Sequence, residues 1–504
     1  MASEKESILE IGYTADSHGC YEELARCVSS FPRNKNSLLI DGGDFLQGSP
    51  LTYYFNRVLP DDGESIPAEL MNLCGYDIIV PGNHEFSYGI PVLQKFLRHL
   101  KANCLCANTT LDGMKKTEIV TLPNGWRIGI TGICTPAADP KLFKDAFSAA
   151  KEASEELDLW KPDLKICIYH GGFEMPPEKF DPERDILQEN ADVDALSDRW
   201  EENQGLRIAK ELDFDILLTA HQHQLIPGRE ICGTYVCQTG MGCRQLLRLT
   251  VHADRRITTE VITPERKPNT DITFCRADAL LQKLLPEFEK WLEKPLGELD
   301  QALPPEEHIR MAAQGSLIAN LINQIEREES GADIACTALG NEISGFRKTV
   351  TAGDILQSYI YPNTLKVIRI NGKTLRRALE RSAEYFTVSS TGALTVSEEF
   401  LSPMVQHFNY DYYSGIEYSI WPEREKGNRV GSVRYCGKEL QDEDELTLAL
   451  NDYRAAGLGG YEFLADCPVL WESGKEISEM IIDYFHTRGK ITVDAHKYIS
   501  VEIP

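Results

Sequence analysis

The chain has 504 residues, with 78 aspartates and glutamates against 52 lysines and arginines, so its formal net charge at pH 7 is −26. Hydrophobic and charged fractions of 42% and 26% are ordinary for a globular protein and exclude a fibrous or wholly disordered chain. The acidic balance argues against wrapping polymeric nucleic acid, whose phosphates are bound by basic side chains. At about 100–200 residues per domain, the length predicts two or more domains.

The sequence also limits where the protein is expected to act. It has no run of about 18 apolar residues, so no membrane span is expected. Residues 1–7 lack the basic and apolar regions of a signal peptide, and export is the alternative if such a peptide has been removed. The 14 cysteines include no Cys-x-x-Cys pair, and several lie in apolar runs. We therefore expect buried thiols and a reducing, cytoplasmic location.

Along the first half of the chain, short apolar runs alternate with helical patterns, which predicts an α/β domain built in layers. Five of these runs are expected to be strands, and each leads into polar residues. Because the carboxyl ends of strands in an α/β sheet form the ligand crevice, we expect the five following loops to converge. The runs are residues 8–14, 37–40, 77–80, 164–169 and 214–219.

The second half of the chain has a different pattern. Residues 263–268 indicate a linker, and residues 277–292 and 315–328 have the pattern of amphipathic helices. Strands are expected at residues 365–370, 416–420 and 446–450, with a helix at residues 372–385. We therefore predict a first domain over residues 1–262, a linker and helix over 263–314, and a second, α+β domain over 315–504.

The polar residues after the five predicted strands share one chemistry. Imidazole and carboxylate groups are ligands of divalent transition metals such as Zn, Mn, Fe or Co. The set is larger than one ion needs and suits two ions with one bridging carboxylate, which could hold a hydroxide between them and clamp a phosphoryl group. The residues are Asp16, His18, Asp44, Asn83, His84, His170, His221 and His223.

These motifs together resemble the signature of the calcineurin-like metallophosphoesterases, in the form found in 5′-nucleotidases and 2′,3′-cyclic-nucleotide 2′-phosphodiesterases. The resemblance continues through the second half, at residues 353–355, 361–365, 371–375 and 451–454. It implies a two-layered β-sandwich flanked by helices, followed by a C-terminal α+β domain that binds the nucleoside. The motifs are Asp16-Ser17-His18, Gly43-Asp44, Gly82-Asn83-His84-Glu85, His170 and His221-Gln222-His223.

The resemblance also implies roles for these residues. His84 is not a ligand in the family but faces the phosphoryl group, where it stabilises charge or protonates the leaving oxygen. The implied reaction is hydrolysis of a nucleotide by a hydroxide that bridges two divalent ions of undetermined identity. One ion is held by Asp16, His18 and His223, the other by Asn83, His170 and His221, and Asp44 bridges them. Asn83 is expected to contact the substrate as well.

The third motif departs from the 5′-nucleotidase form. In those enzymes the sequence after the catalytic histidine continues Glu-Phe-Asp, and the aspartate orients the histidine, whereas here Phe86 is followed by Ser87. A hydroxyl supports an imidazolium less well than a carboxylate. The departure therefore slightly favours 2′,3′-cyclic nucleotides and 3′-nucleotides as substrates, and nucleoside 5′-monophosphates are the second prediction. In the fifth motif Ala220 replaces the usual glycine, which leaves both histidines intact.

A nucleoside needs a flat apolar slot for its base, because every base presents a π-face. The family holds the base between two aromatic rings from stretches that match residues 408–413 and 457–463 here. We expect Tyr410 and Tyr461 to be these rings, with Phe408 and Phe463 as the alternates.

The arginine that contacts substrate in 5′-nucleotidases is missing from the matching segment, residues 338–344. Arg454 and Arg347 are the candidates to replace it.

Two other functions stay open at the level of sequence. A phosphatase for non-nucleotide esters would use the same metals, and substitutions of the aromatic residues would leave its specificity constant unchanged. A nucleotide-binding sensor without catalysis would be marked by a missing metal ligand, and every ligand of the signature is present. The expected partner is a small nucleotide, and the sequence does not fix the metal, the base or the oligomeric state.

Overall fold

The computed structural model describes residues 7–59, 63–135, 142–174, 177, 203–265, 269–361, 363–389, 391–402 and 405–502. Residues 266–268 of the predicted linker and Pro362 of the 361–365 motif lie outside these ranges. The chain forms two compact units, Met1–Phe288 and Glu289–Pro504, which divide within helix α8 (Ile272–Leu292). The division thus falls inside the predicted linker-and-helix segment 263–314, whose limits stay a prediction.

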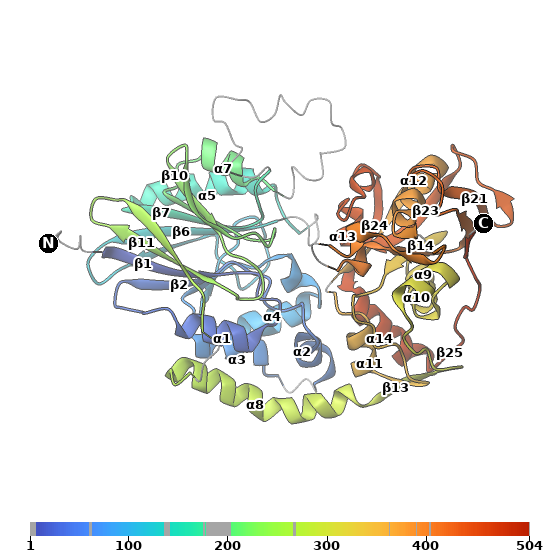
Figure 1. Cartoon of the computed structure of the whole chain (residues 1–504). Helices are drawn as coiled ribbons and strands as arrows, with labels where there is room; N and C mark the ends of the chain where they lie inside the picture. The colour runs from blue at the N-terminus through green and yellow to red at the C-terminus, as the bar shows by residue number, and fades with distance from the viewer. Residues whose placement is uncertain are drawn as a thin grey trace. The chain divides into compact units, whose positions relative to one another are not determined.

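The first unit contains two six-stranded sheets, as a layered α/β domain requires (Figure 1). The first sheet has the order β12-β11-β1-β2-β3-β4, and the second β5-β6-β7-β8-β10-β9. The strands of the first sheet are β1 (Ser7–Thr14), β2 (Ser37–Asp41), β3 (Ile78–Ile79), β4 (Asn103–Cys104), β11 (Leu246–His252) and β12 (Ile257–Ile262). Those of the second are β5 (Thr117–Thr121), β6 (Arg127–Cys134), β7 (Leu164–His170), β8 (Ile216–Thr219), β9 (Ile226–Ile231) and β10 (Thr234–Gln238).

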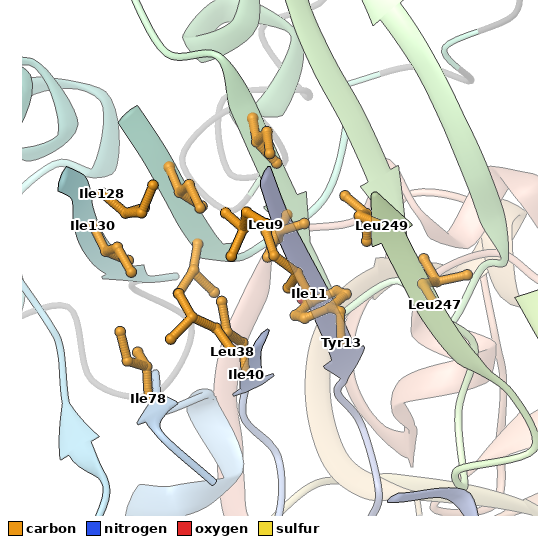
Figure 2. Packing of buried hydrophobic residues seen from close by; sticks show 14 of the residues in the cluster. Leu9, Ile11, Tyr13, Leu38, Ile40, Ile78, Ile128, Ile130, Leu247 and Leu249 are labelled. Atoms are coloured by element: carbon orange, nitrogen blue, oxygen red, sulfur yellow. The ribbon is translucent and has the colours of Figure 1, made fainter. Parts of the chain in front are cut away.

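All five predicted strands are present, and they are shared between the two sheets. β1, β2 and β3 run parallel to one another in the first sheet, and β7 and β8 run parallel in the second. The sheets pack face to face through a core to which both contribute, including Leu9, Ile11 and Tyr13 from β1 and Ile128 and Ile130 from β6 (Figure 2). Alternate residues of β1 enter this core because side chains along a strand point to opposite faces.

Helices cover the outer faces of both sheets. The opposite face of β7, with Cys167 and Tyr169, packs against α5 (Ala146–Trp160) and α7 (Gly205–Glu211). Beside the first sheet lie α1 (Tyr21–Ser29), α3 (Ile66–Cys74) and α4 (Ile90–His99) (Figure 1). The start of α8 packs on α1, where the Arg26 guanidinium lies 4.6 Å from the centre of the Phe274 ring. This layering confirms the predicted fold of the first domain.

The second unit is built on a five-stranded sheet of order β19-β14-β23-β16-β24. Its strands are β14 (Ile334–Ala338), β16 (Thr364–Asn371), β19 (Asp411–Ser414), β23 (Glu445–Asn451) and β24 (Val469–Glu476). Smaller sheets contain β13 (Pro295–Leu299), β15 (Thr349–Thr351) and β25 (Lys490–Ile491); β17 (Phe386–Val388) and β18 (Leu394–Val396); and β20 (Ile416–Ile420), β21 (Val430–Tyr435), β22 (Lys438–Glu439) and β26 (Ile499–Val501).

The helices of the second unit complete the predicted α+β pattern. The predicted helices at residues 315–328 and 372–385 are confirmed as α10 (Leu317–Ser330) and α12 (Gly372–Ala383). None of the helices in the described ranges is long and apolar enough to span a bilayer. The other helices are α9 (His308–Gln314), α11 (Ala352–Ser358), α13 (Asp452–Ala455) and α14 (Ile477–Arg488).

Helix α10 carries a buried carboxyl group in the core of the second unit. Glu326 is fully buried, and neither of its carboxyl oxygens has a hydrogen-bond partner among the described residues. Burial, with the nearby charge of Asp411, raises the pKa of Glu326 well above its usual value. The folded protein therefore holds this carboxyl group in its neutral form, because an unpaired buried charge is costly.

We predict that Glu326→Gln flattens the dependence of stability on pH. Above the usual pKa of a glutamate, unfolding releases the Glu326 proton, so stability falls as pH rises toward the higher pKa of the folded state. Thermal melts from pH 5 to pH 8 should show that the substitution removes this fall, with a gain in Tm at pH 8 of about 2–4 °C for a domain of this size. Glu329→Gln, on an exposed position of the same helix, should leave the profile unchanged. An unaltered slope in the Glu326 variant would contradict the assignment.

Candidate metal centre

The predicted metal ligands all lie at the carboxyl ends of the five strands. Asp16 and His18 follow β1, and Asp44 follows β2. Asn83 and His84 begin the short 3₁₀ turn Asn83–Phe86 after β3. His170 is the last residue of β7, and His221 and His223 follow β8. Packing of the two sheets brings the five loops together, as predicted.

One group of ligand atoms comes from both sheets. Single ligand atoms of Asp16, His18, Asp44 and His223 all lie within 4.8 Å of one another. The Nε2 atoms of His18 and His223 are 3.0 Å apart, and Nε2 of His18 is 3.8 Å from Oδ2 of Asp44. Two imidazole nitrogens and two carboxylates that face one small volume match the donors of a divalent transition metal.

A second group shares Asp44 with the first. Ligand atoms of Asp44, His170 and His221 lie within 4.8 Å of one another. The Oδ1 atom of Asn83 is 3.2 Å from Nε2 of His170 and 3.0 Å from Nδ1 of His221, which adds a fourth donor. Oδ2 of Asp44, the atom that faces His18, is also 3.2 Å from Nε2 of His170. Asp44 therefore belongs to both ligand groups and contacts a histidine of each.

Backbone contacts orient two of these histidines. Nδ1 of His170 donates to the carbonyl of Gly42 at 2.6 Å, and Nδ1 of His18 donates to the carbonyl of Gln47 at 3.1 Å. Because a carbonyl oxygen only accepts, each contact places the hydrogen on Nδ1 and directs the Nε2 lone pair at the ligand group. Such contacts to the far ring nitrogen are typical of histidines that bind metals.

The electrostatics of the site favour a cation. Burial and neighbouring histidines lower the pKa of His18 to about 3 and the pKa of His223 to about 4, although the charge of Asp44 opposes both shifts. Both rings are therefore neutral at pH 7. Burial alone would lower the pKa of His170, yet Asp44 and Asp16 raise it to about 10. Without a metal the site thus keeps a proton on His170 beside Asp44. A divalent ion would supply that positive charge and displace the proton.

The ligand loops have an unusual backbone. Five of the seven candidate ligands have positive φ angles, between 46° and 71°. Residues other than glycine are uncommon in this left-handed region, and such conformations gather at functional sites where the surrounding structure enforces them. The five residues are Asp16, His18, Asp44, His221 and His223.

Glu85 enforces part of this arrangement. Its buried carboxylate accepts hydrogen bonds from the backbone N–H groups of Asp44, Phe45, Leu46 and Gly82, at 2.5–3.0 Å. It thereby joins the loop after β2 to the loop after β3 and fixes Asp44 against the Asn83 turn. Glu85 belongs to the third motif, Gly82-Asn83-His84-Glu85, but the motif alone did not predict this role. Its position directly after the Asn-His pair is the only sequence signal that marked it.

Glycine is required where these two loops meet. A Cβ atom at Gly82 would lie 2.2 Å from Oδ1 of Asp44 and 2.4 Å from Cε1 of His170. Gly43 has a φ of +102°, and a Cβ atom there would lie 2.4 Å from the nitrogen of Gly82. Any side chain at either position would push the ligand loops apart.

His84 lies beside the ligand groups without belonging to either. Its ring centre is 5.2 Å from that of His18, and its backbone N–H donates to Oδ1 of Asp44 at 2.9 Å. The ring is half-buried, and Nδ1 contacts Oε1 of Gln47 at 2.5 Å. His84 thus lies at the edge of the first ligand group, next to His18 and Asp44.

The structure places the two tyrosines predicted to bind the nucleoside in the core of the second unit. Tyr410 and Tyr461 are 1% and 0% exposed, and their hydroxyls bond inside the unit, to the carbonyl of Ala312 and to Ser382. In this structure both rings pack inside the unit, and neither has a face exposed to solvent. The alternates Phe408 and Phe463 are both partly exposed.

Arg454, the predicted substrate-binding arginine, is also buried in the second unit. It is 1% exposed and forms an ion pair with Asp411 at 2.9 Å. It also donates to the carbonyls of Leu458 and Phe408, and its guanidinium stacks 4.1 Å from the centre of the Tyr461 ring. Arg454 thus ties together the two stretches that carry the aromatic candidates. Arg347, the other candidate, pairs with Asp354 at 2.8 Å on the surface of the second unit.

Comparisons with known proteins agree with this site and fold. Residues 9–225 match the family described as calcineurin-like phosphoesterase, and residues 296–466 match the 5′-nucleotidase C-terminal domain. The chain therefore belongs to the calcineurin-like phosphoesterases that carry a 5′-nucleotidase C-terminal domain, which confirms the predicted family. This family and the two ligand groups indicate divalent metal binding.

Relatives of known name span most of the chain. A 2′,3′-cyclic-nucleotide 2′-phosphodiesterase/3′-nucleotidase of Haemophilus influenzae is 23% identical over 92% of this chain and 80% of its own length. A 5′-nucleotidase of Diplobatis ommata is 25% identical over 90% of this chain and 79% of its own. A crystal structure from Staphylococcus aureus, of a protein provisionally named a 5′-nucleotidase, is 29% identical with a TM-score of 0.66 and covers 98% of this chain and 99% of its own.

We predict that Asp44→Asn abolishes binding of the metal pair. Removal of the shared charge weakens both ligand groups at once, so metal analysis of manganese-loaded protein should fall from two ions per chain to fewer than one. Asp41→Asn is the matched control, because Asp41 is equally buried but bonds to Thr14 and the Gly43 N–H instead. Burial raises the pKa of Asp41 to about 8, so a neutral amide should replace it without loss of metal. Equal metal content in the two variants would refute the bridging role of Asp44.

We predict that Arg454→Met destabilises the second unit strongly. Removal of one partner from a buried ion pair leaves an uncompensated charge, on Asp411, which costs about 3–5 kcal/mol in urea unfolding. Arg347→Met removes an arginine from an ion pair of similar length at the surface, where the expected cost is about 0–1 kcal/mol. Similar costs for the two variants would show that the buried pair does not hold this region together.

Proposed function

We propose that the chain is a two-metal phosphohydrolase that cleaves phosphate esters of nucleotides. The observation that supports this most directly is the pair of ligand groups that share Oδ2 of Asp44, with His84 beside them. When bound, two divalent ions supply Lewis-acid activation of water and neutralise charge on the phosphoryl oxygens. In the proposed assignment, Asp16, His18 and His223 hold one ion, Asn83, His170 and His221 hold the other, and Asp44 serves both.

The residues of the chain then perform three tasks in the reaction. The left-handed loops and Glu85 keep the ligands preorganised, so little rearrangement is needed when the substrate binds. The His84 ring faces the phosphoryl group and donates a proton to the leaving oxygen. Asn83 contacts both ion and substrate. Both the fit of the donors and their burial support this division of roles.

For the substrate, we propose 2′,3′-cyclic nucleotides and 3′-nucleotides first, and nucleoside 5′-monophosphates second. Ser87 occupies the position of the aspartate that 5′-nucleotidases use to orient the catalytic histidine, which favours the first class. The Haemophilus influenzae relative is named for the first class and the Diplobatis ommata relative for the second.

For the base, we propose Phe408 and Phe463 in place of the two buried tyrosines. Both rings are partly exposed, and both belong to the stretches that the Arg454 guanidinium joins. The Arg377 guanidinium stacks on Phe463, 4.1 Å from the ring centre, so it leaves at most one face of this ring for a base. Stacking of a base on an aromatic side chain is worth about 1–3 kcal/mol.

We also propose that the protein works in a reducing compartment. All 14 cysteines are free thiols, and nine of them are buried. Free thiols in this number persist where disulfides are kept reduced. Cell fractionation with a compartment marker tests this, and recovery from the periplasm or medium would contradict it.

The proposed activity predicts a specific result in a substrate panel. Manganese-loaded protein should hydrolyse 2′,3′-cAMP and 3′-AMP faster than 5′-AMP, and removal of the metal should stop all three reactions. Release of phosphate from 5′-AMP alone would overturn the substrate order. Binding of nucleotide without turnover on any ester would instead support a sensor.

Phe463→Ala and Phe408→Ala test the role of the aromatic rings. Each should lower kcat/KM for 3′-AMP by about 10- to 100-fold, the loss of one stacked base, while p-nitrophenyl phosphate, which has no base, is hydrolysed as before. Leu401→Ala is the control, since this side chain is 37% exposed in the same unit and carries no ring. Equal changes in kcat/KM for 3′-AMP and p-nitrophenyl phosphate, or no change in either, would favour a phosphatase for non-nucleotide esters.

A further inference from the structure

The side chain that contacts His84 comes from an unexpected loop. Gln47 follows β2, is 0% exposed, and places Oε1 2.5 Å from Nδ1 of His84. In 5′-nucleotidases the acceptor that orients this histidine lies three residues after it in sequence, at the position of Ser87 here. Gln47 instead reaches His84 from 37 residues earlier in the chain.

The contact fixes which nitrogen of His84 faces the reaction. An amide oxygen can only accept, so with Oε1 toward the ring, Nδ1 carries the hydrogen and donates it to Gln47. Nε2 is then the ring nitrogen that can face a reacting group. The orientation of the ring and the identity of the reacting nitrogen thus depend on one hydrogen bond.

Gln47 is itself held firmly. Its backbone carbonyl accepts from Nδ1 of His18. The backbone N–H and carbonyl of the preceding residue, Leu46, both form hydrogen bonds. The Leu46 N–H donates to Glu85 at 3.0 Å, and the Leu46 carbonyl accepts from Asn56 at 3.1 Å. These are backbone contacts, so substitution of the Gln47 side chain should leave them and the metal ligands in place.

The other end of the Gln47 amide has no assigned role. Its Nε2 atom is buried and has no hydrogen-bond partner among the described residues. A buried donor left unpaired is costly, by about 1–3 kcal/mol. An amide is therefore present here despite this cost, and the contact of its Oε1 atom with Nδ1 of His84 gives a reason for it.

We propose that Gln47 is the positioning residue for His84 in the hydrolysis, an inference that rests on the proposed function. As the oxygen of a water molecule bonds to phosphorus, the bond from phosphorus to the ester oxygen breaks. The ester oxygen leaves with the Nε2 proton of His84, while the other hydrogen stays on Nδ1 and keeps its hydrogen bond to Oε1 of Gln47. The proton lost by the water passes through solvent and restores His84. A neutral amide directs the ring without adding the negative charge of a carboxylate.

The first test compares two leaving groups. Gln47→Leu should lower kcat for 3′-AMP, whose leaving alcohol needs a proton, by about 10- to 100-fold, a part of the effect of general acid catalysis. With p-nitrophenyl phosphate, whose leaving group needs none, kcat should change less than about 3-fold. KM and metal content should stay close to those of the unsubstituted protein. Gln47→Glu, which keeps an acceptor oxygen, should recover most of the activity.

Matched variants separate positioning from general damage. Gln204→Leu removes another buried glutamine of the same unit, which accepts from the Phe147 N–H and donates to Asp145. This substitution should lower kcat for the two esters by the same factor or leave both values unchanged. In a His84→Ala background, Gln47→Leu should cause no further loss, because the two residues act as one unit. A full additive loss in that background would overturn the inference.

A spectroscopic readout keeps this inference separate from the proposed function. In zinc-loaded protein labelled with ¹⁵N-histidine, the His84 signal, identified by its absence in His84→Ala, should show hydrogen on Nδ1 and lose this pattern in Gln47→Leu. If the unsubstituted protein cleaves no ester, the proposed function is wrong, but the spectrum still shows whether Nδ1 of His84 donates to Gln47. An unchanged His84 spectrum, or equal loss on both esters, would overturn the role of Gln47.

Discussion

The position of Asp44 is the constraint on which the rest of the site depends. Its carboxylate lies 1% exposed between histidines from both sheets, and its Oδ2 atom faces both ligand groups. Burial alone would raise the pKa of this group, but His170 and His84 outweigh burial and lower it well below its usual value. A charge kept in the interior requires positive partners at close range. Two divalent cations satisfy that requirement better than a shared proton, because they meet all of the surrounding donors at once.

The same constraint explains the backbone around the site. Left-handed conformations at Asp16, His18 and Asp44 turn their side chains inward immediately after a strand, where an ordinary loop would turn away. The network at Glu85 holds two of these loops against each other. Strain of this kind persists only where the surrounding packing is strong, and here it rests on a dense core between two sheets. The net charge of −26 is a property of the whole chain, whereas the ligand groups around Asp44 favour the binding of cations.

Much of this arrangement could be predicted from the sequence. The five strand ends were recognisable because apolar runs lead directly into ligand-type residues, and parallel strands must bring such ends together. Gln47 and Glu85 could not be predicted, since their roles depend on contacts across 37 to 41 residues of chain that leave no local pattern. The burial of the aromatic residues could not be predicted for another reason: Tyr410 and Phe408 differ by two positions, and only packing decides which ring is buried. The ion pair of Arg454 with Asp411 could not be predicted either, because the sequence does not show whether an arginine is buried.

We propose that one metal ion lies on each side of Asp44. Anomalous diffraction from crystals of the manganese-loaded protein tests it most directly. We expect two peaks about 3.5–4 Å apart, one among Asp16, His18 and His223 and the other among Asn83, His170 and His221, with Asp44 bound to both. A single peak, or two peaks of which only one contacts Asp44, would contradict it.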